Sequence, residues 1–106
     1  MEYTVLGRTN MTVSIMGMGC GGPSRVGKRT GRSEMESVDI VKRALEAGVN
    51  IIDTAAAYET EEIVGKAIKG RDRNSVIIST KMRVWAEMTA KDLRLALEKS
   101  LRKLDT

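Results

Sequence analysis

The sequence predicts an α/β fold built on a parallel sheet. Short apolar runs typical of buried strands alternate with segments of helical periodicity, in the order hairpin, β, α, β, α, β, α. Strands and helices that alternate in this way imply parallel strands joined by right-handed crossovers. Two of the runs lead into charged residues, Asp53 and Lys81. The burial of a strand gives no reason for a charged residue at its end. In α/β barrels, however, residues at the carboxyl ends of the strands carry the chemistry.

The composition is that of one domain or of a piece of one. Of the 106 residues, 42% are hydrophobic but none is Phe, so aliphatic side chains and the seven Met must form the core. The net charge of +4 is mild and no base-reading motif is present, so we expect no nucleic-acid partner. The single Cys20 excludes an internal disulfide. No membrane span or signal peptide is evident, and we expect a cytoplasmic protein without a membrane partner or a metal.

The first fifth of the chain predicts a hairpin followed by the first parallel strand. Tyr3–Leu6 and Met11–Ser14 flank the turn residues Gly7–Asn10, as in a short β-hairpin. Ile15–Gly19 is an apolar strand that the segment Cys20–Pro23 ends sharply. We expect the Cys20 thiol to pack as a small apolar group, with a reactive thiol as the alternative. The glycines that follow favour a tight turn over a phosphate-binding loop, because no helix begins there.

A basic loop comes next. The segment Arg25–Arg32 carries four cationic residues and no acid. We predict a disordered, solvated loop; the alternative is that it binds an anionic substrate or partner.

Three helices are predicted by capping residues and by apolar periodicity. They cover Ser33–Ala47, Thr60–Lys69 and Thr89–Leu104, each beginning at a Ser or Thr that can cap it. Gly48 and Gly70 are suited to end the first two. Helical spacing places one apolar face of the last helix in the core, namely Leu93, Ala96, Leu97, Leu101 and Leu104.

The remaining strands, Val49–Asp53 and Val76–Thr80, place polar groups at one edge of the sheet. We expect both to lie parallel to the first strand, with the helices on one side. Asp53, Tyr58 and Lys81 should then converge, the carboxylate within about 4 Å of the ammonium, where opposite charges influence each other's ionisation. Each residue has a simpler interpretation: Asp53 as a turn cap, Tyr58 as a cover over the strand ends, and Lys81 as solvated surface.

Three βα units form an incomplete sheet. Both outer strands would have unpaired backbone groups, and edges of that kind invite association. A closed barrel needs eight units over about 250 residues. We therefore expect residues 1–106 to be the N-terminal part of a single larger barrel domain, and the chain alone to self-associate.

Four groups of residues, in register along the chain, resemble the N-terminal part of an aldo-keto reductase. The matching residues are Leu6–Thr9, Val13–Ser14, Gly17–Gly22, Gly48, Asp53–Ala55, Tyr58, Glu61, Val64–Gly65, Ser79–Lys81 and Leu97–Leu104. The segment Gly48–Asn50 departs from the aromatic-Arg form of eukaryotic members and is similar to bacterial ones.

The resemblance implies a (β/α)8 TIM barrel, of which this chain would hold the hairpin and the first three βα units. It also implies an enzyme that binds NADPH without a Rossmann fold and reduces aldehydes and ketones, a small-molecule carbonyl substrate. Tyr58 would be the general acid, with Lys81 and Asp53 as its partners, while Asp53 and Gly21 would border the cofactor. The family's fourth catalytic residue is a His at the end of the fourth strand, and this chain contains no His.

The chemistry of these groups agrees with that implication. A carbonyl that receives a hydride becomes an alkoxide and must take up a proton. A phenol, with an ordinary pKa of about 10, is a weak acid near neutral pH unless a cation stabilises its anion, and Lys81 can do so. Trp85 would either line the substrate pocket or pack under the loop. Two alternatives are a non-catalytic binding or regulatory subunit on the same scaffold, and an inactive truncated fragment.

Overall fold

The computed structural model describes all residues, 1–106, and has the predicted order of elements. The strands are β1 (Tyr3–Val5), β2 (Thr12–Ser14), β3 (Met18–Gly19), β4 (Ile51–Asp53) and β5 (Ile77–Ser79). The helices are α1 (Glu34–Glu46), α2 (Glu61–Ile68) and α3 (Ala90–Leu104), with 3-10 turns η1 (Ala56–Tyr58) and η2 (Arg73–Ser75). Every strand is shorter than predicted, although backbone hydrogen bonds such as that from Cys20 to Asp53 continue just past the strand ends. None of the helices combines the length and the apolar character that a transmembrane helix requires.

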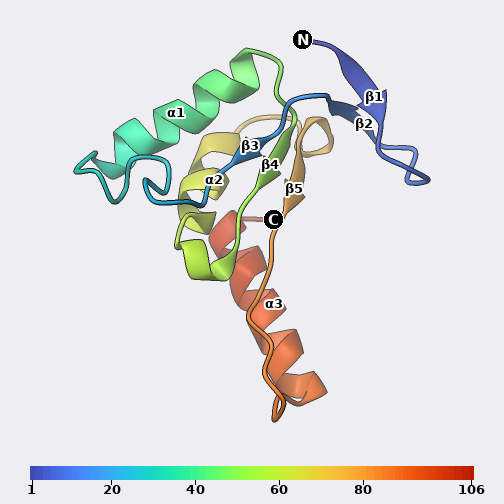
Figure 1. Cartoon of the computed structure of the whole chain (residues 1–106), viewed down its shortest axis with the longest axis vertical. Helices are drawn as coiled ribbons and strands as arrows, with labels where there is room; N and C mark the ends of the chain where they lie inside the picture. Colours follow the sequence, from blue (N-terminus) through green and yellow to red (C-terminus); the bar gives the residue numbers. More distant parts are fainter.

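The three βα strands form a parallel sheet in the order β3-β4-β5, as predicted. Gly19 lies opposite Asp53, and Asp53 lies opposite Ser79, so all three strands end at the same level. The central strand β4 is flanked on both sides (Figure 1). This register brings the carboxyl ends of the strands, and the residues after them, to one edge.

The predicted hairpin is present as a separate antiparallel pair of β1 and β2. Asn50, just before β4, ties it to the main sheet. Its Oδ1 accepts from the Ser14 backbone N–H at 2.7 Å, and its Nδ2 donates to the Thr12 carbonyl at 2.9 Å. The hairpin is thus fixed at the amino end of the sheet, opposite the edge where Asp53 lies.

The first and last helices begin with complete capping boxes. Ser33 and Thr89 accept from the backbone of Glu36 and Asp92, whose carboxylates accept from the cap residues in return. Thr60 occupies the N-cap position of α2, but its side chain makes no capping bond, so that prediction is wrong in its chemistry. Its hydroxyl is instead bonded inside the protein, to partners described below.

One hydrophobic core lies between the sheet and the helices. Ile52, at the centre of β4, is fully buried. It lies in a cluster to which α1 and α2 contribute, as predicted, whereas α3 contributes only Leu104 in its last turn. The members are Cys20, Val26, Val38, Val41, Leu45, Val49, Ile52, Ile63, Val64, Ala67, Ile68, Val76 and Leu104.

The predicted core face of α3 is wrong for most of its length. Leu104 is buried, but Leu93, Leu97 and Leu101 are 37%, 46% and 39% exposed. The helix extends away from the sheet and meets the rest of the chain through α2 (Figure 1). Helical periodicity identified the apolar face correctly, but no element of this chain covers it.

The basic loop is also more ordered than predicted. Residues 24–32 form successive turns with backbone hydrogen bonds, and Val26 is buried in the core. Arg25 forms an ion pair with Glu59 at 3.0 Å, and Lys28 donates to the Glu59 carbonyl at 2.9 Å. The prediction of a disordered loop is therefore wrong, because Arg25 and Lys28 bind Glu59, the residue after η1, which lies distant in sequence.

Candidate functional site

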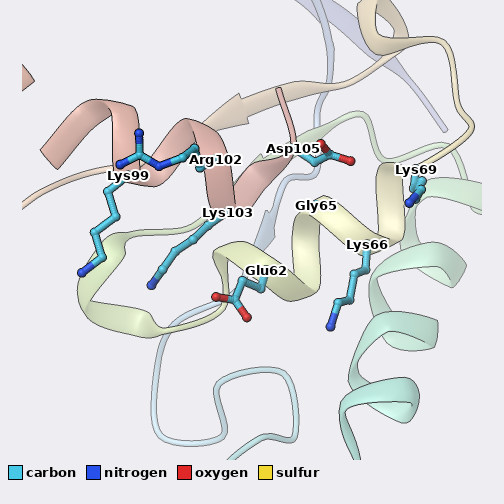
Figure 2. Close-up of a pocket in the computed structure, with 8 residues that line it drawn as sticks. All are labelled: Glu62, Gly65, Lys66, Lys69, Lys99, Arg102, Lys103 and Asp105. Atoms are coloured by element: carbon cyan, nitrogen blue, oxygen red, sulfur yellow. The ribbon is translucent and has the colours of Figure 1, made fainter. Parts of the chain in front are cut away.

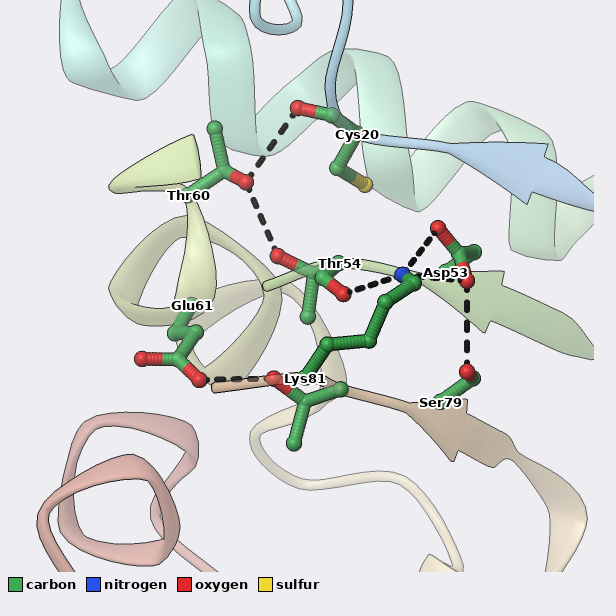
Figure 3. Close-up of polar contacts among 8 residues, drawn as sticks. Cys20, Asp53, Thr54, Thr60, Glu61, Ser79 and Lys81 are labelled. Atoms are coloured by element: carbon green, nitrogen blue, oxygen red, sulfur yellow. Dashed lines mark hydrogen bonds and ion pairs between the residues drawn. The ribbon is translucent and has the colours of Figure 1, made fainter. Parts of the chain in front are cut away.

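Asp53 and Lys81 form a close ion pair at the carboxyl edge of the sheet. The Lys81 ammonium lies 2.7 Å from both carboxylate oxygens of Asp53 and 2.8 Å from the Thr54 carbonyl (Figure 3). Ser79, at the end of β5, donates to the same carboxylate at 3.2 Å. The predicted approach of carboxylate and ammonium is confirmed. Three acceptor atoms hold the ammonium, so its position is fixed by the ends of two neighbouring strands.

Tyr58 completes the group. The Lys81 ammonium lies 5.1 Å from the centre of the Tyr58 ring, within the range of a cation–π contact. The backbone N–H of Ala56 donates to the Lys81 carbonyl at 2.9 Å, which attaches η1 to the end of the third βα strand. The predicted convergence of the three side chains is therefore confirmed, although their chemical roles stay predictions.

Gly21 lies directly against the Tyr58 ring. A Cβ atom at Gly21 would lie 2.8 Å from Cε2 and 2.9 Å from Cζ of the ring. The absence of a side chain at this position lets the loop after β3 serve as the surface on which the ring rests. Sequence alone assigned Gly21 only to the cofactor, and this contact could not be read from spacing, because the two residues are far apart in the chain.

The simpler interpretation of Asp53 as a turn cap finds no support in its contacts. Its oxygens accept from Lys81 and Ser79, and η1 has no side-chain cap. The side chains of Asp53 and Lys81 remain 44% and 48% exposed. Ion pairs with that exposure contribute little to stability, typically about 0–1 kcal/mol. The pair therefore holds an ammonium group at an exposed edge of the sheet.

A second, buried polar network lies beneath the pair. The Thr54 and Thr60 hydroxyls are 2.9 Å apart, and Thr60 donates to the Cys20 carbonyl at 3.2 Å (Figure 3). Thr80 donates at 2.7 Å to Glu61, whose side chain is almost completely buried. These bonds join the ends of all three strands to the start of α2. Sequence reasoning missed this network; the only available signal was the concentration of Thr residues around the strand ends.

Cys20 belongs to the core, as predicted. Its side chain is fully buried. Burial, aided by the nearby Asp53 carboxylate, raises the pKa of its thiol to about 11. The thiolate is the reactive form of cysteine, so both effects argue against a reactive thiol here.

Trp85 lies in the loop between Lys81 and α3. It is 54% exposed and lines a hollow of about 390 Å³ between its own loop and α3, together with Met88 and Leu95. The hollow includes neither Tyr58 nor Lys81 but is lined by Ala56 and Met82 near them, and a place for Trp85 in the substrate pocket stays a prediction.

Comparison with known proteins agrees with this architecture. The chain is 42% identical over 88 residues to aldo-keto reductase YhdN of Bacillus subtilis, an alignment that covers 76% of this chain and 25% of that protein. It is 36% identical over 88 residues to the NADH-specific methylglyoxal reductase of Escherichia coli, covering 76% of this chain and 26% of that one. The chain thus spans about a quarter of the length of the curated relatives it matches.

Solved structures of aldo-keto reductases have the same fold over the length of this chain. Aldo-keto reductase AKR11C1 of Bacillus halodurans, in its holo form, superposes with a TM-score of 0.79 at 31% identity, over 100% of this chain and 37% of that one. Bombyx mori aldo-keto reductase AKR2E4, in complex with NADP, superposes with a TM-score of 0.73 at 32% identity, over 98% and 34%. These neighbours are (β/α)8 barrels, so the predicted fold class is confirmed. A sequence model of the Aldo/keto reductase family matches residues 16–106, and this chain belongs to that family.

Proposed function

We propose that a protein carrying this chain within a complete barrel is an oxidoreductase that reduces aldehydes and ketones to alcohols with NADPH. Residues 1–106 would form the N-terminal part of that single domain. The observation that carries the proposal is the Lys81 ammonium, held by Asp53 and Thr54 against the face of Tyr58. The names of relatives that reduce methylglyoxal support a small carbonyl compound as the substrate.

Tyr58 is the proposed general acid. Its phenol donates a proton to the carbonyl oxygen as negative charge develops there, and a phenolate remains. The Lys81 cation beside the ring would stabilise the negative charge of that phenolate. Asp53 keeps the ammonium in place, so it acts as a positioning residue for Lys81. A preorganised donor directed at the developing oxyanion is commonly the largest contribution in such catalysis.

The edge also suits a nicotinamide cofactor. No side chain here can donate a hydride, so the reaction needs a group that does, and NADPH supplies the hydride when it is bound. Asp53 and Lys81 keep nearly half of their surface exposed after pairing, which leaves polar atoms for a ligand. We assign Asp53 and Gly21 to the cofactor side of the site. The relatives' names include both NADH and NADP, and NADPH is our proposal for this protein.

The proposal is tested by following NADPH oxidation spectroscopically, in the complete barrel protein, with methylglyoxal and a panel of other aldehydes and ketones. We expect saturable turnover with at least one member of the panel. Cofactor binding without turnover of any carbonyl compound would contradict the proposal and favour a regulatory subunit on the same scaffold. NADH is assayed in parallel, and a lower kcat/KM with NADH is expected.

The isolated chain should behave differently. Both outer strands, β3 and β5, have one unpaired edge, and the apolar face of α3 is exposed. Such edges and faces favour association between copies. We propose that residues 1–106 alone self-associate and show no carbonyl reduction. Gel filtration combined with the NADPH assay checks both points; turnover by a monodisperse monomer of this length would contradict them.

A further inference from the structure

A groove lies between α2 and α3, on the helical side of the fold and away from the Asp53–Lys81 pair. The two helices meet at Gly65, where an added Cβ would lie 2.7 Å from the Lys103 carbonyl oxygen. Because the backbones touch there, longer side chains on either side diverge and leave a hollow of about 400 Å³ (Figure 2). We refer to it as the α2–α3 groove. Its lining residues are Glu62, Gly65, Lys66, Lys69, Lys99, Arg102, Lys103 and Asp105.

The groove has an excess of positive charge: five cationic residues face two acids. Lys66 is paired with Glu34 of α1, and Arg102 has Glu98 at 3.9 Å. The other three, Lys69, Lys99 and Lys103, have no carboxylate within 4.0 Å.

The helix dipole accounts for only part of this charge. Cations in the last turn of a helix offset the negative end of the dipole, which applies to Lys103. Lys99 lies more than one turn before the end of α3, where that effect has faded. Lys99 and Lys103 extend from α3 toward the same side (Figure 2). Two ammonium groups with no carboxylate within 4.0 Å therefore line the same groove.

The same two lysines border a second hollow of different character. This one, of about 390 Å³, is walled by apolar side chains that include Trp85, Met88 and Leu95. Glu61, almost fully buried and bonded to Thr80, also lines it. Lys99 and Lys103, which have no carboxylate partner, thus line both the basic groove and the apolar hollow.

We propose that a small amphipathic anion, such as an alkyl or aryl phosphate, binds across the α2–α3 groove and the apolar hollow beside it. Its anionic group lies on Lys99 and Lys103, and its apolar part lies against Trp85 and Met88. The volume is in the usual range for small-ligand sites, about 300–1,000 Å³. Glu61 and Asp92 both line the apolar hollow and would repel an anionic group placed there, whereas five cationic residues outnumber two acids in the α2–α3 groove. The ligand would bind apart from the proposed carbonyl site.

The test uses octyl phosphate below its critical micelle concentration. Inorganic phosphate and 1-octanol serve as controls for its anionic part and its apolar part. Isothermal titration calorimetry with the complete barrel protein measures the Kd of each compound. We expect saturable binding of octyl phosphate, with a Kd at least tenfold below that of either control compound. An equal Kd for 1-octanol would show an apolar surface without an anion site, and would overturn the proposal.

Charge variants locate the anionic group. Lys99→Gln with Lys103→Gln should raise the Kd at least tenfold. The matched control, Lys91→Gln with Arg94→Gln, makes the same change of net charge on the same helix, at exposed positions outside both hollows, and should change the Kd less than twofold. Equal weakening in both variants would reduce the effect to overall charge and refute the site.

Two further measurements keep the test decisive. Circular dichroism checks that each variant keeps its helical content. If the double variant loses helical content, Lys99→Gln alone is used, and it should raise the Kd about threefold. An unchanged Kd in that single variant would contradict the proposal. The titration is repeated at tenfold lower concentration of the complete barrel protein, with an unchanged Kd expected. A Kd that follows the protein concentration would assign the probe to a contact between copies and would overturn the proposal.

Discussion

Replacing Gly21 with Ala tests how the Tyr58 ring is held. The new Cβ would lie 2.8, 2.9 and 3.0 Å from three atoms of the ring. Carbon atoms in contact prefer about 3.5–4.0 Å, so the ring must move by roughly 0.7–1 Å. The backbone at Gly21 has no positive φ, so Ala introduces no strain of its own. The substitution therefore acts on the Tyr58 ring and not on the local fold.

The expected effect on catalysis follows from that displacement. A misplacement of about 1 Å can lower a rate on the order of 10²-fold. In the complete barrel protein, Gly21→Ala should therefore reduce kcat by about that factor. If Gly21 also borders the cofactor, the Kd of NADPH will rise as well, so the kcat at saturating cofactor isolates the effect on Tyr58.

The control is Gly19→Ala, two residues earlier, where a Cβ would meet no atom within 4 Å. Steady-state kinetics of both variants, with binding of NADPH measured separately, should show a large loss of kcat for Gly21→Ala and a change under twofold for Gly19→Ala. Unaltered kcat in Gly21→Ala would refute the idea that this glycine sets the position of the ring.

Two other predictions concern stability. Gly65→Ala would place a Cβ 2.7 Å from the Lys103 carbonyl oxygen and 2.9 Å from Leu104 backbone atoms. Urea unfolding should show that the free energy of unfolding falls by about 1–3 kcal/mol, the usual result of overpacking. A rise of about 1 kcal/mol, as for a helical glycine in open space, would contradict the close contact. Hydrogen bonds from Ser33 and Thr89 lower the pKa of the Glu36 and Asp92 carboxyls. Their stabilisation is therefore present above the unfolded pKa near 4 and lost as pH falls through the folded values, so Glu36→Gln with Asp92→Asn should show a shallower decline of unfolding free energy below about pH 4.

Much of the fold and of the ion pair was predictable because local patterns determine both. Apolar runs alternating with helical segments require parallel strands, and parallel strands bring their carboxyl ends to one edge. The contact between Asp53 and Lys81 follows directly, although the two lie far apart in sequence. Capping by Ser33 and Thr89 was predictable for the same reason, because it depends on residues within one turn.

Other features depend on partners that no local pattern reveals. Thr60 lies at a cap position, yet its hydroxyl is bonded to Thr54 and to the Cys20 carbonyl, which burial favours over a cap at the surface. The basic loop is held by Glu59, 34 residues beyond Arg25. Periodicity shows that α3 has an apolar face, but it does not show what covers that face.

The most direct test of the proposed role of Tyr58 is its replacement by Phe in the complete barrel protein. Phe keeps the ring beside Lys81 and Gly21 but removes the hydroxyl that would donate the proton. We predict that kcat falls on the order of 10²–10⁴-fold, the range of general acid catalysis, while the Kd of NADPH changes less than about threefold. Turnover close to that of the unmodified protein, with the cofactor still bound, would show that the proton comes from another group.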